Sequence, residues 1–196
     1  MIVGETFVWA HVPKTAGDAT VRMIRQVPRL VVMADHPGDH AKHVALDLRR
    51  GSIQGKRLVA NVRRLPDWAF SYMRHRERFG LWPDYEPQGP RSADVVAAES
   101  AADAWLDQIV GGYEIDFWIR QEHLADDLVR FLRETAALTD EEEAAIRSVG
   151  RVNDQRPRRL QRLRRGTPER FFSAAQVEAL YASNPRWAAV ERAVYD

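Results

Sequence analysis

The feature that most constrains the fold is a short apolar run that ends in a proline and a turn of small residues. Residues 6–12 are β-branched, aromatic and aliphatic, and this composition and length indicate a buried strand. Pro13 ends the run, the turn 14–17 follows, and residues 19–26 have the apolar spacing of a helix. Such a strand–turn–helix can hold an anion, because backbone N–H groups and the helix dipole both face the turn.

Strand-like and helix-like segments go on alternating along the chain. Apolar runs predict further strands at residues 30–34, 57–62 and 115–119. Helices are expected at 42–50 (stopped by Gly51), 66–78, 93–110, 123–135 and 139–147 (N-cap Thr139), at a segment capped by Ser173, and at a short one after Pro185. This order is typical of an α/β domain with a central parallel β-sheet flanked by helices and a helical C-terminal half. We expect one domain over residues 1–196, with residues 79–100 as an insertion or lid and residues 151–170 as an Arg-rich loop.

Composition and charge exclude several classes of protein. The absence of cysteine rules out disulfide scaffolds, thiolate metal sites and cysteine nucleophiles. The sequence has neither an apolar run of the ~18 residues that a membrane span needs nor a secretory signal, so we expect a cytoplasmic protein. The net charge of +1 divides into +6 over residues 1–93, −11 over 94–143 and +6 over 144–196. The acidic middle segment argues against extended contact with nucleic acid, whereas a local anion site remains open.

The turn itself offers two interpretations. Lys14 adds a mobile cation with three hydrogen-bond donors to the expected anion cradle. The turn is not a Walker A loop, because Lys14 precedes Gly17 and the lysine of that motif follows its glycines. On spacing alone, an ordinary turn with a surface lysine fits equally.

Two motifs in sequence order carry a family resemblance. Residues 11–17 (HVPKTAG) resemble the 5′-phosphosulfate loop, (apolar)-H-x-P-K-T-[GA]-G-T-[ST], of sulfotransferases that use 3′-phosphoadenosine 5′-phosphosulfate (PAPS). Residues 62–71 (VRRLPDWAFS) resemble the family's V-R-[ND]-P-x-x-R-x-x-S-x-Y and keep Arg63 and Ser71 eight residues apart. The chain is therefore similar to PAPS-dependent sulfotransferases of the bacterial type, which are related to the Golgi carbohydrate and cytosolic enzymes. The resemblance implies a P-loop-like α/β domain in three layers.

Three weaker similarities extend the resemblance over nearly the whole chain. Residues 116–128 resemble the family's strand-to-helix segment, in which Glu122 is expected to be architectural. Arg164-Arg165-Gly166 resembles the R-K-G loop around the 3′-phosphate and adenosine, although a plain Arg-rich linker fits as well. Residues 42–49 resemble a K-H-x-x-A-x-x-L-R segment of bacterial members.

The resemblance implies transfer of a sulfuryl group from PAPS to an acceptor hydroxyl, leaving adenosine 3′,5′-bisphosphate (PAP), with no metal required. Lys14 would stabilise the leaving oxygen. The cofactor-binding residues carried over are Pro13, Lys14, Thr15, Ala16, Gly17, Asp18, Ala19, Thr20, Arg63, Ser71, Arg164, Arg165 and Gly166. The acceptor is a small molecule, a sugar or a natural product, and Trp68, Trp82 and Tyr85 are candidates to line its groove. Trp68, on a helix that packs against the sheet, is more often a core residue. The oligomeric state stays open, a homodimer included.

The chain departs from the family pattern in both motifs. Asp18-Ala19 replaces the Thr-Ser after the loop glycine, which removes two hydroxyl donors and puts a carboxylate where an anion would dock. We expect Asp18 to cap the following helix and Thr20 to supply a hydroxyl instead. Pro66 stands one position later than the proline of R-[ND]-P, which would re-aim Arg63 slightly.

Histidines are the candidates for the base that takes the acceptor proton. His36, His40 and His43 follow the second predicted strand, at the sheet edge where ligands bind in α/β proteins. We rank His43 first and His40 second, with a surface role as the alternative for each. His11 is expected to be a packed core residue. A zinc site is disfavoured, because Pro37 and Gly38 make the histidine-rich stretch a loop rather than one helical face.

Three other functions stay open on sequence. A catalytically silent, sulfotransferase-like nucleotide-binding protein would share the same loop. A P-loop-like small-molecule kinase would use Thr15 for its metal, but no carboxylate ends the strand 57–62. An RNA-binding module would use residues 151–170.

Overall fold

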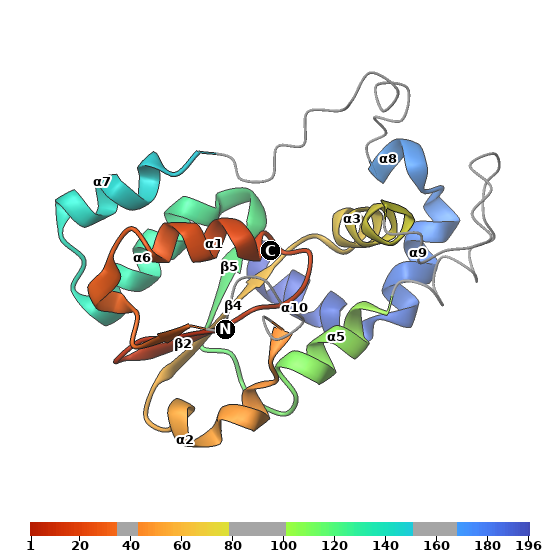
Figure 1. The fold of residues 1–196 in the computed structure, drawn as a ribbon. Coiled ribbons are helices and arrows are strands. Elements are labelled where there is room, and N and C mark those ends of the chain that lie inside the picture. The colour runs from red at the N-terminus through yellow and green to blue at the C-terminus, as the bar shows by residue number, and fades with distance from the viewer. Residues whose placement is uncertain (35–42, 79–100, 151–167) are drawn as a thin grey trace. The chain divides into compact units, whose positions relative to one another are not determined.

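The computed structural model describes residues 1–34, 43–78, 101–150 and 168–196 (Figure 1). These residues divide into two compact units, one of residues 1–34, 43–62 and 105–150 and one of residues 63–78, 101–104 and 168–196. Each unit is described by itself.

A five-stranded sheet forms the centre of the first unit. Its strands are β1 (Ile2–Val3), β2 (Phe7–Ala10), β3 (Met33–Ala34), β4 (Arg57–Val62) and β5 (Phe117–Arg120). They lie in the order β3-β1-β2-β4-β5. Strands β2, β4 and β5 are mutually parallel, with Ala10 opposite Ala60 and Ala60 opposite Trp118. The predicted parallel sheet is found at the centre, but the edge differs, because the unpredicted β1 is antiparallel to both β2 and β3.

Helices flank this sheet, as the sequence predicts. The helices of the first unit are α1 (Gly17–Ile24), α2 (Arg50–Ile53), α6 (Leu124–Ala136) and α7 (Asp140–Ser148), and α5 (Ala102–Ile109) leads into it. Figure 1 shows α1, α6 and α7 together on one side of the sheet and α2 on the other. Apolar side chains of the strands and of α1, α6 and α7 fill one core, among them Trp9, Ile24, Phe131 and Ile146.

Several boundaries differ from the sequence predictions for local reasons. The strand expected at 30–34 keeps only β3, because Pro28–Leu30 forms a 3₁₀ turn. In place of a helix over 42–50 that stops at Gly51, a 3₁₀ turn (Leu46–Arg49) leads into α2, which contains Gly51. Strand β4 has the predicted bounds, and Thr139 caps α7 as predicted, in a reciprocal capping box with Glu142.

The described part of the second unit is helical. It comprises α3 (Leu65–Arg78), α8 (Pro168–Phe171), α9 (Ala174–Ser183) and α10 (Pro185–Tyr195). Ser173 caps α9 as predicted, whereas the final helix α10, expected to be short, runs for 11 residues. Trp68 stacks on Tyr72 with ring centroids 4.9 Å apart and packs against Trp187 at 5.1 Å. Trp68 is fully buried, so it is the core residue that the sequence offers as the alternative to a place in an acceptor groove. Trp82 and Tyr85 lie outside the described residues.

Among the described residues, no helix combines the length and apolar character that a membrane span requires.

Candidate functional site

The loop between β2 and α1 has an unusual backbone. Lys14 and Ala16 have φ values of 64° and 70°, in the left-handed region that residues other than glycine rarely adopt. Each such residue costs about 1 kcal/mol or more, and strain of this kind persists where the surroundings enforce it, most often at functional sites. Ala16 is also the residue at which α1 begins, and no side chain caps that helix. The first-turn N–H groups of α1 and the left-handed turns therefore form a cradle for an anion.

Gly17 is required in this loop by a close approach. A Cβ atom built on Gly17 would lie 1.8 Å from Nε2 of His11. His11 is buried, as predicted, and its ring lies between those of Trp9 and His43, with centroid distances of 5.0 and 4.5 Å. Without a glycine at this position, the imidazole of His11 and the start of α1 could not occupy their places.

A buried amide holds the loop from the neighbouring strand. Asn61, in β4, is fully buried, and its Nδ2 donates to the carbonyl of Thr15 at 2.8 Å and to Oγ1 of Thr20 at 2.7 Å. Its Oδ1 accepts from Nε1 of Trp9 at 2.8 Å. Asn61 is a residue that the sequence analysis missed. The sequence does contain a sign of its role: Asn61 is the one amide in an otherwise apolar stretch of strand, and a buried polar group must find hydrogen-bond partners.

The hydroxyls near the loop are used inside the protein. Thr15 Oγ1 donates to the carbonyl of Val12 at 2.8 Å, and Thr20 Oγ1 donates to the carbonyl of Ala16 at 3.3 Å. Asp18 is exposed in the first turn of α1, and the expectation that it caps the helix is wrong, because the N-cap position belongs to Ala16. The loop thus presents backbone N–H groups and the half-buried Lys14.

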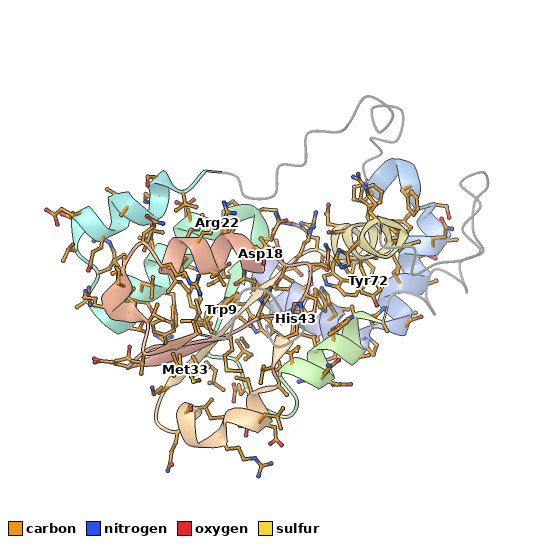
Figure 2. All side chains as sticks on the ribbon, in the orientation of Figure 1. Trp9, Asp18, Arg22, Met33, His43 and Tyr72 are labelled. Atoms are coloured by element: carbon orange, nitrogen blue, oxygen red, sulfur yellow. The ribbon has the colours of Figure 1, made fainter. Side chains whose placement is uncertain are left out.

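His43 lies beside this loop, as the sequence predicts for a residue after the second expected strand. Its Nδ1 is 3.0 Å from the carbonyl oxygen of His11, which directly follows β2. A carbonyl only accepts, so Nδ1 carries the proton and, in the neutral ring, Nε2 carries the lone pair that a general base needs. Figure 2 labels Trp9 and His43 below α1 and Asp18 along it. His36 and His40 lie outside the described residues.

A second site candidate, in the second unit, is the junction that follows β4. The carbonyl of Arg63 accepts a hydrogen bond of 2.9 Å from Nε1 of Trp187, and its guanidinium lies 3.7 Å from the carboxylate of Asp67. At the start of α3, the N–H of Leu65 donates at 2.8 Å to Oε2 of Glu191, a buried residue of α10. Trp187 and Glu191, one turn apart in α10, therefore bond to the backbone on either side of Arg64.

The charges at this junction are balanced locally. Tyr181 donates to Oε1 of Glu191 at 2.9 Å, and burial together with this bond raises the pKa of the Tyr181 phenol. Arg64 stands where the family pattern has Asp or Asn; its guanidinium lies 4.4 Å from the ring centroid of Tyr195 and 3.7 Å from Glu191. Ser71 is half-buried on α3. The predicted residues Arg164, Arg165 and Gly166 lie outside the described part of the chain.

The carboxylate that organises the end of β5 is Asp127. It accepts from the backbone N–H of Arg120 at 2.9 Å and from the Arg120 guanidinium at 2.8 and 2.9 Å. Burial alone would raise the pKa of Asp127, but these bonds hold it below its usual value. Glu122, the expected architectural residue of this segment, is exposed.

Within the described ranges, no three histidine or acidic side chains gather closely enough to hold a metal ion.

One of the comparisons with known proteins, the comparison with solved structures, shows the fold class. The described sheet and helices have the fold of a sulfotransferase. The solved structure that shows this is mouse sulfotransferase SULT7A1 complexed with PAP, with a TM-score of 0.50, 18% sequence identity, and coverage of 96% of this chain and 87% of that chain. No protein-family model matches the sequence, and no curated protein matches it either.

Proposed function

We propose that this protein is a sulfotransferase of the bacterial type, which binds PAPS and moves its sulfuryl group to a hydroxyl of a small-molecule, carbohydrate or natural-product acceptor. The observation that carries the proposal is the β2–α1 loop, in which Lys14 and Ala16 are held in left-handed conformations directly before a helix that lacks a side-chain cap. A strained cradle beside a lysine suits the 5′-phosphosulfate. A fold shared with a sulfotransferase solved with PAP supports the same function.

The residues divide into two groups by the part of the cofactor they would bind. Residues 13–20 form the 5′ group, in which backbone N–H groups and Lys14 bind the anion, while Thr15 and Thr20 keep the loop in shape. Arg63 and Ser71, with Arg164, Arg165 and Gly166, form the 3′-phosphate group by resemblance. Trp187 and Glu191 fix the backbone beside Arg63.

The chemistry asks little more of the protein than position and charge. PAPS supplies the sulfuryl group, which forms a bond to the acceptor oxygen while its bond to the phosphate oxygen breaks and PAP leaves. Lys14 neutralises the charge that develops on the leaving oxygen. His43 holds its Nδ1 proton on the carbonyl of His11, so that Nε2 receives the acceptor's proton. His40 is the second candidate for this role.

A titration of thermal stability with PAP tests the proposal. Wild type should be stabilised as PAP rises, because a ligand that binds only the folded state shifts the unfolding equilibrium. Lys14→Met should lose most of this shift. Lys56→Met is the matched control, because Lys56 lies before β4 and donates to the carbonyl of Gly4. If PAP fails to stabilise wild type, or if Lys14→Met responds as wild type does, the proposal is wrong.

A catalytically silent nucleotide-binding protein is the second candidate. It is favoured by Asp18-Ala19, which supplies no hydroxyl to the loop, and by the internal bonds of Thr15 and Thr20. PAP-dependent stabilisation without sulfuryl transfer to a panel of hydroxyl acceptors would support it. The structure disfavours the kinase alternative. A kinase would need the Thr15 hydroxyl to bind a metal, but this hydroxyl is buried and donates to the carbonyl of Val12.

A further inference from the structure

We propose that Asn61 is a positioning residue for the anion-binding loop. Its amide holds the backbone of a loop that, unlike the family pattern, has no hydroxyls after its glycine to bind the ligand. This inference rests on the proposed function, because it assigns Asn61 to the 5′ side of the PAPS site. It concerns a residue of β4 that lies outside both family motifs.

The chemistry of its partners fixes the orientation of the Asn61 amide. Nε1 of Trp9 only donates, so it must face Oδ1, and the carbonyl of Thr15 only accepts, so it must face Nδ2. The second N–H of Nδ2 then points to Oγ1 of Thr20. Both hydrogens and the oxygen of a fully buried side chain are used, and an amide is the group that satisfies this set without an added charge.

The two Nδ2 bonds are made on either side of the strained residue. Thr15 directly precedes Ala16, and Thr20 lies one turn further on in α1 and itself donates to the carbonyl of Ala16. Asn61 therefore ties the loop and the first turn of α1 to the central strand β4 as one unit. A loop released from this tie would relax out of the left-handed conformation and turn its N–H groups away from the anion.

The dependence on backbone geometry should be stronger here than in a loop rich in hydroxyls. A hydroxyl rotates to follow a ligand, whereas a backbone N–H points where the chain sends it. The hydroxyls of Thr15 and Thr20 donate to backbone carbonyls of the protein, and the carboxylate of Asp18 has no proton to donate. Binding of an anion by the loop therefore depends on Lys14 and on the directions in which the backbone N–H groups point. Asn61 sets those directions.

The test compares two nucleotides that differ only at the 5′ position. Isothermal titration measures the affinity of PAP, and competition against PAP measures that of adenosine 3′-monophosphate, which lacks the 5′-phosphate. Asn61→Val should weaken PAP binding about tenfold, the loss expected when buried hydrogen bonds to the loop are removed, and leave adenosine 3′-monophosphate unchanged. Thr20→Val, which removes a single hydroxyl, should weaken PAP about threefold on the same grounds, and Thr20→Ser should restore it.

Ile146→Val is the control for a general loss of stability. It thins the core at α7, away from the loop, and should leave the ratio of the two affinities as in wild type. If wild type does not prefer PAP to adenosine 3′-monophosphate, the proposed function fails. If wild type prefers PAP and both Asn61→Val and Thr20→Val keep the full preference, the role of Asn61 is refuted and the proposed function stands. Thr20→Val decides the question if Asn61→Val does not fold.

Discussion

The β2–α1 loop and the β4–α3 junction are each held by a buried polar side chain, but the two side chains differ in chemistry. In each, a buried polar side chain from another element bonds to backbone at the start of a helix. At the loop this side chain is the neutral amide of Asn61, which accepts from Trp9 and donates to Thr15. At the junction it is the carboxylate of Glu191, which accepts from Leu65 and Tyr181.

The difference lies in what each anchor demands of its surroundings. An amide both donates and accepts, so Asn61 can hold the carbonyl of Thr15 while it accepts from Trp9. A carboxylate only accepts, so it must be surrounded by donors. Glu191 finds one for each oxygen and has Arg64 3.7 Å away. The loop anchor is therefore independent of pH, whereas the junction anchor includes the phenol of Tyr181, whose pKa is raised.

The largest expected effect is at the loop, from Gly17→Ala. The added Cβ would lie 1.8 Å from His11 Nε2, and the ring is enclosed by Trp9 and His43. Overpacking of this kind should cost about 3 kcal/mol in the free energy of unfolding, measured by urea denaturation. Gly51→Ala is the control, because no atom lies within 4 Å of its Cβ position in α2; it should be neutral or stabilise by about 0.5 kcal/mol. Equal stability of the two variants would contradict the packing argument.

The next largest loss of stability is expected from Glu191→Leu, which removes the acceptor at the β4–α3 junction. It leaves the buried N–H of Leu65 and the hydroxyl of the half-buried Tyr181 without their acceptor, for a loss of about 2 kcal/mol in unfolding free energy. Glu191→Gln keeps one acceptor oxygen for Leu65 and can donate to the Tyr181 oxygen, so it should cost about half as much. Chemical denaturation of the three proteins checks the order. A leucine variant as stable as the glutamine variant would show that these bonds contribute little.

Sequence alone predicted several local features of the chain. The bounds of β4 follow from an apolar run, and the caps at Thr139 and Ser173 follow from hydroxyl residues that directly precede a helix. The candidate base His43 is found beside the loop because strands and helices alternate in the predicted order. Each of these depends on a few neighbouring residues or on the topology of α/β sheets.

The anchors could not be predicted, because their partners are distant in sequence. Asn61 is separated from Thr15 by 46 residues, and Glu191 from Leu65 by 126. Strand β1 escaped prediction for a similar reason, since a two-residue segment becomes a strand only through its pairing with β2 and β3. Asp18 was expected to cap α1 from its residue type, but the left-handed Ala16 moves the helix start two residues earlier.

Trp187→Phe should weaken the junction by a smaller amount. The ring keeps its place against Trp68, but the bond from Nε1 to the carbonyl of Arg63 is lost, for about 1 kcal/mol in unfolding free energy. If Arg63 binds the 3′-phosphate, the variant should also lose part of its preference for PAP over adenosine 5′-monophosphate. The loop variant Thr20→Val is the counterpart and should keep that preference. Identical nucleotide profiles for the two variants would refute the division of the site into two separately positioned parts.

The smallest expected effect is a difference in pH dependence between the Glu191 anchor and the Asn61 anchor. Because folding raises the pKa of Tyr181 above its ordinary value of 10.0, the folded protein keeps a phenol proton that the unfolded chain loses. The stability that Tyr181 adds is therefore fully present below pH 10 and falls as the pH rises above it. The difference in unfolding free energy between wild type and Tyr181→Phe should shrink over this alkaline range. The difference between wild type and Thr20→Val should stay constant there, since no group bonded to Asn61 titrates. A parallel decline of both differences would mean that alkaline pH loosens the protein as a whole rather than the Glu191 anchor.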